Sequence, residues 1–461
     1  MRFGYIIDHP KRDLPGGILL ARALASRGVQ TVLVPLYQQG LDVPNLHLDG
    51  LVVNFARPIN FNLVRSYFEK GIPVWVMDTE GGVLTDKGAN SPKALSNYIK
   101  SSGFKDFLAG YFFWGHEIYN AFKVNSGMLE KGLHLTGCPR FDWASSRWRI
   151  LLSKDSQDYI LINTNFSLVN PLFAGSEEAE VENIVAAGWD KTYVKELVDN
   201  QRAIFIDYIR TLENLFESRP SRKFILRPHP FESSEFYHKV FSKYNNVSVF
   251  CEGSVLNMIK NANAVIHLNC GTAIECVLLE TLPISLEFLN TEFMKSHVSL
   301  PSKVSLRVNN FEELLQTIDK IPEAKSRFPF NRLHSEFIEP WFHVNDGYAS
   351  DRMADILILY AKEHGKNVTN KSNLKNFLRL DRRLTLLQLF QITVSTFLGS
   401  LIVAILRSLL QKNRRDKLLK LEVIKELIDA IEMVDGETKM KVNWATHPTT
   451  RLKLASVLID P

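Results

Sequence analysis

The sequence is poor in cysteine and lacks the short motifs of several large enzyme classes. The four cysteines among 461 residues show no Cys-x-x-Cys spacing, so neither a zinc site nor a disulfide framework is expected. There is no Gly-x-Gly-x-x-Gly, Gly-Lys-Ser/Thr, His-Glu-x-x-His, Gly-x-Ser-x-Gly or Asp-x-Asp motif. These absences argue against dinucleotide redox chemistry and P-loop hydrolysis, and they predict a site without a bound metal or other cofactor.

Positive charge is concentrated in one segment of the chain. Residues 365–420 hold twelve Lys and Arg against two Asp, a net of +10, which leaves −5 for the rest of a chain whose formal charge is +5. Nucleic-acid binding by the whole molecule is therefore not expected. The chain begins directly with an apolar run that does not resemble a signal peptide, and we expect a cytoplasmic protein.

Residues 1–150 alternate short apolar runs with helical stretches. Apolar runs at 3–8, 30–35, 50–55 and 73–77 read as buried strands, and the residues between His9 and Gly17 read as a turn-rich loop. The pattern repeats from 159 to 286, with a long helix expected over 193–218. Near-continuous apolar strands alternating with helices predict two doubly wound, Rossmann-like α/β domains, at 1–150 and 151–364.

The third predicted region, 365–461, is a basic and amphipathic helical tail. Residues 384–406 carry no charge, and basic clusters flank them. We favour a helix at the membrane surface, acting through 379–420, over a membrane-spanning helix or a helix packed on the protein. A final helix is expected over 417–434, with apolar positions at Leu421, Ile424, Ile428 and Ile431.

Two loops of the second domain suggest a phosphate site. Arg227-Pro228-His229-Pro230 follows an apolar strand and holds a guanidinium and an imidazole at its end. Another strand runs into Asn269-Cys270-Gly271-Thr272, where a helix begins, and Glu275 follows one turn later. The amides at the helix start and Thr272 could bind phosphate, and Glu275 could accept ribose hydroxyls. A structural loop and a simple capping box are the plainer alternatives.

Candidate acids lie in the first domain. Asp78-Thr79-Glu80-Gly81-Gly82 follows a strand and suits acid/base work or attack on an anomeric carbon, although it also fits a plain turn. Asp8, which ends the first strand, is the competing carboxylate. We expect Asp8, Lys11 and Arg12 to bind the acceptor, and the two basic residues suit an anionic one.

The order of these motifs resembles that of bacterial surface-carbohydrate biosynthesis proteins, which are similar to capsule and O-antigen β-Kdo transferases. The likeness covers about residues 1–360 and rests on Arg12-Asp13-Leu14, Asp78–Gly81, Thr136–Asp142, Asn163-Thr164-Asn165-Phe166, Arg227–Pro230, Gly271–Glu275, Asp346-Gly347 and Ser350-Asp351-Arg352. It departs from the related pattern at Cys138, where asparagine is common, and at Thr79, which separates the two acids.

The resemblance implies a GT-B glycosyltransferase. It would transfer a sugar from a nucleotide donor, CMP-linked such as CMP-Kdo, to a lipid-linked glycan at the inner face of the plasma membrane. Asp78 or Glu80 would act on the sugar, His229 would contact the donor phosphate, and Asn163, Thr164 and Asn165 would complete the donor site. Two other hypotheses stay open: a CDP-glycerol-type glycerophosphotransferase, and a non-catalytic assembly factor at the membrane.

Overall fold

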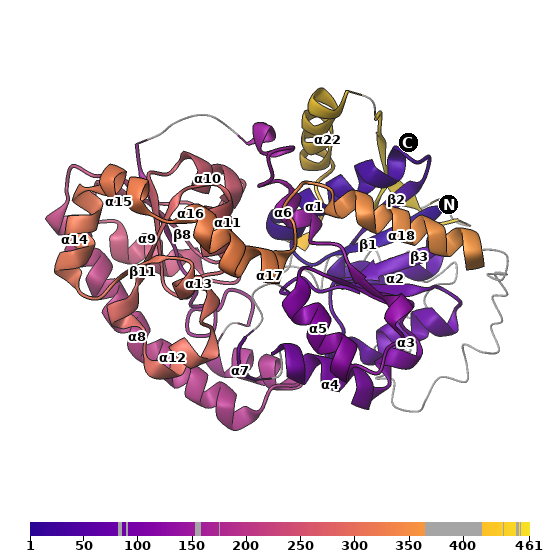
Figure 1. Cartoon of the computed structure of the whole chain (residues 1–461), viewed down its shortest axis with the longest axis horizontal. Coiled ribbons are helices and arrows are strands. Elements are labelled where there is room, and N and C mark those ends of the chain that lie inside the picture. The colour runs from indigo at the N-terminus through magenta and orange to yellow at the C-terminus, as the bar shows by residue number, and fades with distance from the viewer. Residues whose placement is uncertain are drawn as a thin grey trace.

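The computed structural model describes residues 1–81, 85–88, 91–152, 158–174, 176–364, 417–436, 438–448, 451 and 453–461. Two α/β domains lie side by side (Figure 1), each built on a largely parallel sheet. Apolar side chains on both faces of each sheet pack against helices. The predicted fold class of two doubly wound, Rossmann-like α/β domains is confirmed.

The first sheet has the strand order β13-β14-β2-β1-β3-β4-β5-β6. Strands β1 to β6 are mutually parallel and come from the first 135 residues. They span Arg2–Ile7, Gln30–Pro35, Gly50–Val53, Val74–Met77, Gly110–Phe113 and Leu133–Leu135. Its helices are α1 (Pro10–Ala25), α2 (Gln39–Asp42), α3 (Phe61–Glu69), α4 (Pro92–Ser102), α5 (His116–Asn125) and α6 (Pro139–Asp142).

The second sheet is parallel throughout, with the order β12-β11-β10-β7-β8-β9. Strands β7 to β12 span Ile160–Asn163, Phe224–Arg227, Val247–Val249, Ala264–His267, Leu282–Leu286 and Leu306–Val308. Helices around it include α7 (Glu177–Ala186), the long α8 (Lys191–Ser218), α9 (Ser234–Phe241), α10 (Val255–Asn261), α11 (Thr272–Leu278), α12 (Glu292–His297), α13 (Leu300–Lys303), α14 (Phe311–Asp319) and α15 (Ile321–Arg327).

The chain then crosses back to the first domain. After α16 (Phe330–Leu333) and α17 (Glu339–Phe342), α18 (Ala349–His364) packs on α1. Asp142 fixes the start of α18, because its carboxylate accepts hydrogen bonds from the backbone amides of Ala349 and Ser350 at 3.2 and 3.0 Å. By its packing, α18 therefore belongs with the first domain, although our predicted boundaries assigned it to the second.

The start of α1 differs from the predicted loop. The helix begins at Pro10 and runs through Pro15, Gly16 and Gly17, residues that suggested a turn. Pro10 takes the first helical position, where its missing N–H leaves no intrahelical bond unmade. Pro15 lies inside the helix, where it cannot donate to the carbonyl of Lys11. Gly16 serves close packing instead, because a Cβ there would lie 2.7 Å from the backbone nitrogen of Arg140. The α1–α6 contact thus brings Arg140 beside the end of β1.

The described part of the C-terminal region is not only helical. Helix α22 (Leu421–Asp435) buries Ile424, Ile428 and Ile431 as its spacing predicted. The chain then forms β13 (Lys441–Thr446) and β14 (Lys453–Asp460), which the sequence analysis did not predict. The β14 strand pairs antiparallel with β2 and extends the first sheet. Figure 1 shows the two chain ends close together on this domain.

Most of the predicted membrane-binding range lies outside the described residues. This holds for 379–416, including the uncharged stretch 384–406. Among the described residues, no helix is long and apolar enough to cross a bilayer. Lys417 falls within the predicted range, but it is buried in the protein and therefore does not face lipid headgroups.

Candidate functional site

A cavity of ≈ 290 Å³ opens between the two domains, at the carboxyl ends of the strands. Its lining comes from the segments that follow β1, β4 and β6 of the first domain, and from those that follow β7, β8, β9, β10 and β11 of the second. Parallel sheets bind ligands at this edge. Among the predicted site residues, the lining includes Lys11, Arg12, Glu80, Asn163, Thr164, Asn165, Arg227, His229, Asn269, Gly271, Thr272 and Glu275. Asp8 and Asp78 are not in the lining.

Asp78 is held inside the first domain. Its carboxylate pairs with Arg57 at 2.8 Å, accepts the Tyr111 hydroxyl at 3.2 Å, and accepts the backbone amide of Glu80 at 3.0 Å. The side chain is almost fully buried. Asp78 therefore fixes the turn that carries Glu80, which corrects the expectation that either acid could reach the substrate.

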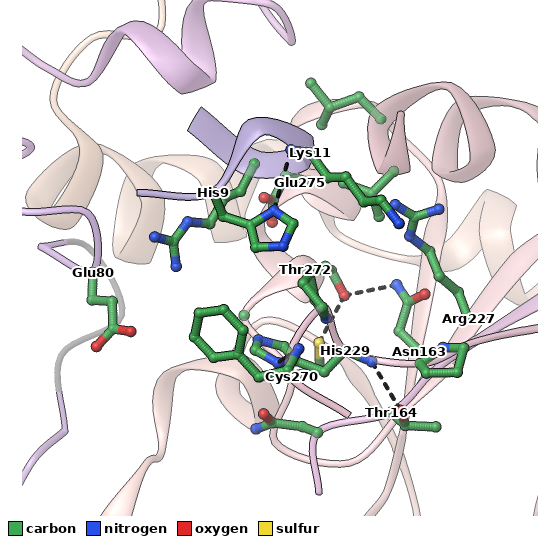
Figure 2. Close-up of a pocket in the computed structure, with 18 of the residues that line it drawn as sticks. His9, Lys11, Glu80, Asn163, Thr164, Arg227, His229, Cys270, Thr272 and Glu275 are labelled. Atoms are coloured by element: carbon green, nitrogen blue, oxygen red, sulfur yellow. Dashed lines mark hydrogen bonds between the residues drawn. The ribbon is translucent and has the colours of Figure 1, made fainter. Parts of the chain in front are cut away.

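Glu80 is the acid that faces the cavity. In Figure 2 its carboxylate lies on the opposite side of the cavity from Arg227 and Asn163. Its side chain keeps contact with solvent, while the surrounding protein desolvates the carboxylate and raises its pKa; nearby Arg12 partly opposes this. A glutamate with a raised pKa binds a proton more readily than an ordinary carboxylate, which suits acid/base work.

Asp8 and Arg12 form an ion-paired cluster at the end of β1. The Arg12 guanidinium lies 2.6 Å from Asp8 and 2.8 Å from Asp13. Asp8 also contacts the Lys417 ammonium at 3.2 Å. Asp8 is thus a partner of cations, and the expectation that it binds the acceptor directly is corrected, because only Arg12 and Lys11 reach the cavity wall.

His229 is neutral and its proton is located by a backbone contact. The amide of Phe231 donates to Nδ1 at 3.3 Å, which leaves the proton on Nε2. Desolvation lowers the pKa of His229 to about 3, and Arg12 and Arg140 add to this. The imidazole can therefore donate one hydrogen bond without carrying charge.

A buried glutamate holds the His229 loop. Glu232 accepts the Phe166 amide at 2.7 Å and the Thr164 hydroxyl at 2.8 Å. Thr164 in turn accepts the backbone amide of His229 at 3.2 Å. Thr164 therefore serves the loop after β8 as well as lining the cavity, and Glu232 links the loops after β7 and β8 into one unit.

The guanidinium of Arg227 is hydrogen-bonded mainly to backbone carbonyls. Its terminal nitrogens donate to the carbonyls of Glu252 and Gly253 at 2.8 and 3.0 Å. Burial lowers the pKa of its guanidinium, and the described side chains give it no salt bridge. Arg227 thus contributes positive charge to the wall while it shapes the 252–253 loop.

Two buried oxygens in the cavity wall have no protein partner within the described residues. Asn163 donates its amide to the Thr272 hydroxyl at 2.9 Å, and its Oδ1 is unpaired. Glu275 pairs through Oε1 with Arg140 of the first domain, and its Oε2 is unpaired. Such acceptors suit a ligand that carries hydroxyl or amino donors.

Asn269 and Asn165 mainly shape the loop after β10. Asn269 adopts a positive φ of 51° and exchanges two amide hydrogen bonds with Asn290, at 2.8 and 3.2 Å. Asn165 donates to the Asn269 carbonyl at 3.0 Å. Their side chains are therefore committed to the protein, and Gly271 and Thr272 present the adjoining surface of the wall.

Sequence reasoning missed two groups at the cavity, His9 and Arg140. The backbone amide of Lys11 donates to Nδ1 of His9 at 3.2 Å, so His9 is also neutral with its proton on Nε2. Desolvation is the main cause that lowers its pKa to about 3. The position of His9 directly after the buried strand predicted at 3–8 could have indicated that it lies at the cavity. Arg140 belongs to the quoted 136–142 motif, but nothing local indicated its interdomain partner.

Comparison with known proteins found no matching family model and no matching curated protein. Several solved structures are similar. The S. aureus MnaA–UDP complex is 13% identical, with 80% of this chain and 98% of that chain covered and a TM-score of 0.47. A Methanocaldococcus jannaschii UDP-GlcNAc 2-epimerase in complex with UDP-GlcNAc and UDP is 14% identical, with 78% and 100% covered and a TM-score of 0.44.

The wall teichoic acid polymerase TagF is 12% identical, with 69% of this chain and 74% of that chain covered and a TM-score of 0.44. Likenesses of this size carry no information about activity. The function proposed below therefore rests on the sequence motifs and on the residues of the cavity.

Proposed function

We propose that the protein is a glycosyltransferase of bacterial surface-polysaccharide biosynthesis. It transfers a sugar from a nucleotide donor, CMP-linked such as CMP-Kdo, to a lipid-linked glycan at the cytoplasmic face of the membrane. The cytidine base, the acidic sugar and the lipid-linked acceptor come from the resemblance of the sequence motifs. The position of the chemistry comes from the interdomain cavity.

The observation that supports the proposal most is the charge of that cavity. Within the described residues its wall holds four cationic side chains and two carboxylates, which favours an anionic ligand. The cations are Lys11, Arg12, Arg140 and Arg227; the carboxylates are Glu80 and Glu275.

The cavity wall offers a suitable protein group to each part of the nucleotide donor. The phosphate would accept the Nε2 hydrogen of His229, because hydrogen bonds to a leaving phosphate stabilise the charge that builds up on it. The ribose hydroxyls would donate to the unpaired oxygens of Glu275 and Asn163. Glu80, on the other side of the cavity, would exchange a proton with the acceptor hydroxyl or the sugar.

Nucleotide binding tests this proposal directly. CMP should raise the melting temperature of the wild type, and His229→Ala should abolish the shift. His238→Ala is a matched control, because His238 is an exposed histidine on α9. If uridine or guanosine nucleotides raise the melting temperature and cytidine nucleotides do not, the donor assignment is wrong.

A second candidate is transfer of an alditol phosphate from a CDP-glycerol-type donor. Two neutral imidazoles at the cavity that keep a hydrogen on Nε2, His9 and His229, favour it, because both can donate to the phosphate oxygens on which charge builds up during attack on phosphorus. Turnover separates the two functions. Under the first proposal Glu80→Gln abolishes transfer from a CMP-sugar; under the second, CDP-glycerol is consumed, His9→Ala abolishes transfer and Glu80→Gln does not.

A further inference from the structure

Lys417 is a buried lysine that contacts both domains. The residue is 5% exposed, and its ammonium lies 3.2 Å from Oδ1 of Asp8, directly after β1. The same ammonium lies 4.5 Å from the ring centre of Phe231 and 5.6 Å from that of Phe173, both in loops of the second domain. A buried ammonium is retained only with such partners.

On the side of the second domain, Lys417 touches the loop of His229. The ring of Phe231 lies against His229, with centres 5.4 Å apart, and against His9, with centres 5.9 Å apart. The backbone amide of Phe231 also fixes the His229 tautomer. A change in the position of Phe231 would therefore move both imidazoles.

On the side of the first domain, Lys417 shares Asp8 with Arg12. Oδ1 of Asp8 receives Lys417, and Oδ2 receives Arg12 at 2.6 Å. Arg12 lines the cavity, and Lys417 does not. With Lys417 absent, the full charge of Asp8 would act on Arg12 and hold it back from an anion in the cavity.

We infer that Lys417 is a positioning residue of the interdomain cavity, which joins Asp8 to Phe231 and thereby keeps Arg12 available for an anionic ligand. The C-terminal segment thus supplies a third part of the site. The inference rests on the proposed function only for the choice of CMP as ligand, because any small anion that reaches Arg12 tests it.

The test is equilibrium binding of CMP and of inorganic pyrophosphate to the full chain. Lys417→Met should weaken binding about tenfold, since Asp8 then acts on Arg12 alone and holds it back from the anion. Lys417→Arg should restore most of the affinity because it keeps the charge. Asp8→Asn/Lys417→Met should bind more tightly than Lys417→Met, because a neutral amide in place of the carboxylate no longer restrains Arg12. Lys420→Met, an exposed lysine three residues on, should bind like the wild type.

The outcomes separate the two proposals. If Lys417→Met keeps the melting temperature and binds both ligands as the wild type does, or if the double variant gains nothing over Lys417→Met, the inference is wrong. If the wild type binds pyrophosphate in a Lys417-dependent way but binds no nucleotide, the inference stands and the proposed function fails.

Discussion

The two sides of the cavity differ in chemistry. The first domain contributes charge: Arg12, Lys11 and Arg140 with their acidic partners, and Glu80. The second domain contributes mainly neutral groups that are fixed by hydrogen bonds, such as His229 and Thr272. Glu80 can exchange a proton during the reaction, whereas neutral donors that are fixed by hydrogen bonds define where a ligand lies. We therefore expect loss of Glu80 to alter turnover most, and loss of the hydrogen bonds that fix the groups of the second domain to alter binding and stability.

The largest effect should come from Glu80→Gln. Removal of a general acid or base lowers kcat by about 10²- to 10⁴-fold, while nucleotide affinity should change little because Glu80 lies apart from Asn163 and Arg227. Steady-state kinetics with a CMP-sugar measures kcat, and calorimetry measures nucleotide affinity. Glu117→Gln, an exposed acid on α5, is the control. If Glu80→Gln and the wild type had the same kcat, the proposed difference in chemistry between the two sides of the cavity would be contradicted.

The next largest effect should come from Glu232→Ala, on the neutral side. The change leaves the Thr164 hydroxyl and the Phe166 amide without their acceptor. Unpaired buried donors cost about 1–3 kcal/mol each. The free energy of unfolding should fall by about 3 kcal/mol in urea denaturation, and nucleotide affinity should fall with it. An unchanged affinity in a destabilised protein would show that the His229 loop does not depend on Glu232.

Neutral histidines should make the second domain sensitive to acid. Burial lowers the pKa of His267 to about 3, against about 6.5 in an unfolded chain. The unfolded state therefore binds the extra proton first, and this contribution to stability is lost as the pH falls below about 6.5. Asp142 and Glu232, whose pKa burial raises to about 7, act in the opposite direction.

The difference between wild type and variant isolates this histidine effect. His267→Gln should show a weaker loss of melting temperature between pH 7 and pH 5 than the wild type, and His238→Gln should follow the wild type. Parallel curves for His267→Gln and wild type would contradict a neutral His267.

The smallest effect should come from Lys11→Met. Lys11 lies 3.4 Å from exposed Glu252 of the second domain, and exposed ion pairs contribute roughly 0–1 kcal/mol. The melting temperature should stay nearly constant, while CMP affinity falls a few-fold and becomes less sensitive to salt. A large loss of stability would mean that this contact between the domains matters more than its exposure suggests.

Much of the fold follows from local sequence. Buried parallel strands are continuous apolar runs, so β2 was predicted at its observed bounds, 30–35. Polar residues directly after such strands converge on one edge, which is why most predicted site residues line one cavity. The sequence does not show which of Asp78 and Glu80 faces the cavity, because two residues of one turn can point to opposite sides of that turn.

The rest depends on distant partners. The Pro10–Gly17 segment looked like a loop, because the close approach of Arg140 to Gly16 is not visible in local sequence. Strand β14 is recognised only by its pairing with β2, which lies more than 400 residues earlier in the chain. Lys417 belongs to a basic cluster, and nothing in that cluster indicates that one lysine is buried against Asp8.

The pairing of β14 with β2 has a consequence for the order of folding. The second domain, from β7 to α15, is one continuous stretch and can form as soon as the ribosome releases it. The first domain is discontinuous in sequence, because β13 and β14, which extend its sheet, are made long after β1 to β6. During synthesis this edge of β2 therefore stays unpaired until β14 has been made, and an unpaired strand edge can pair with another chain.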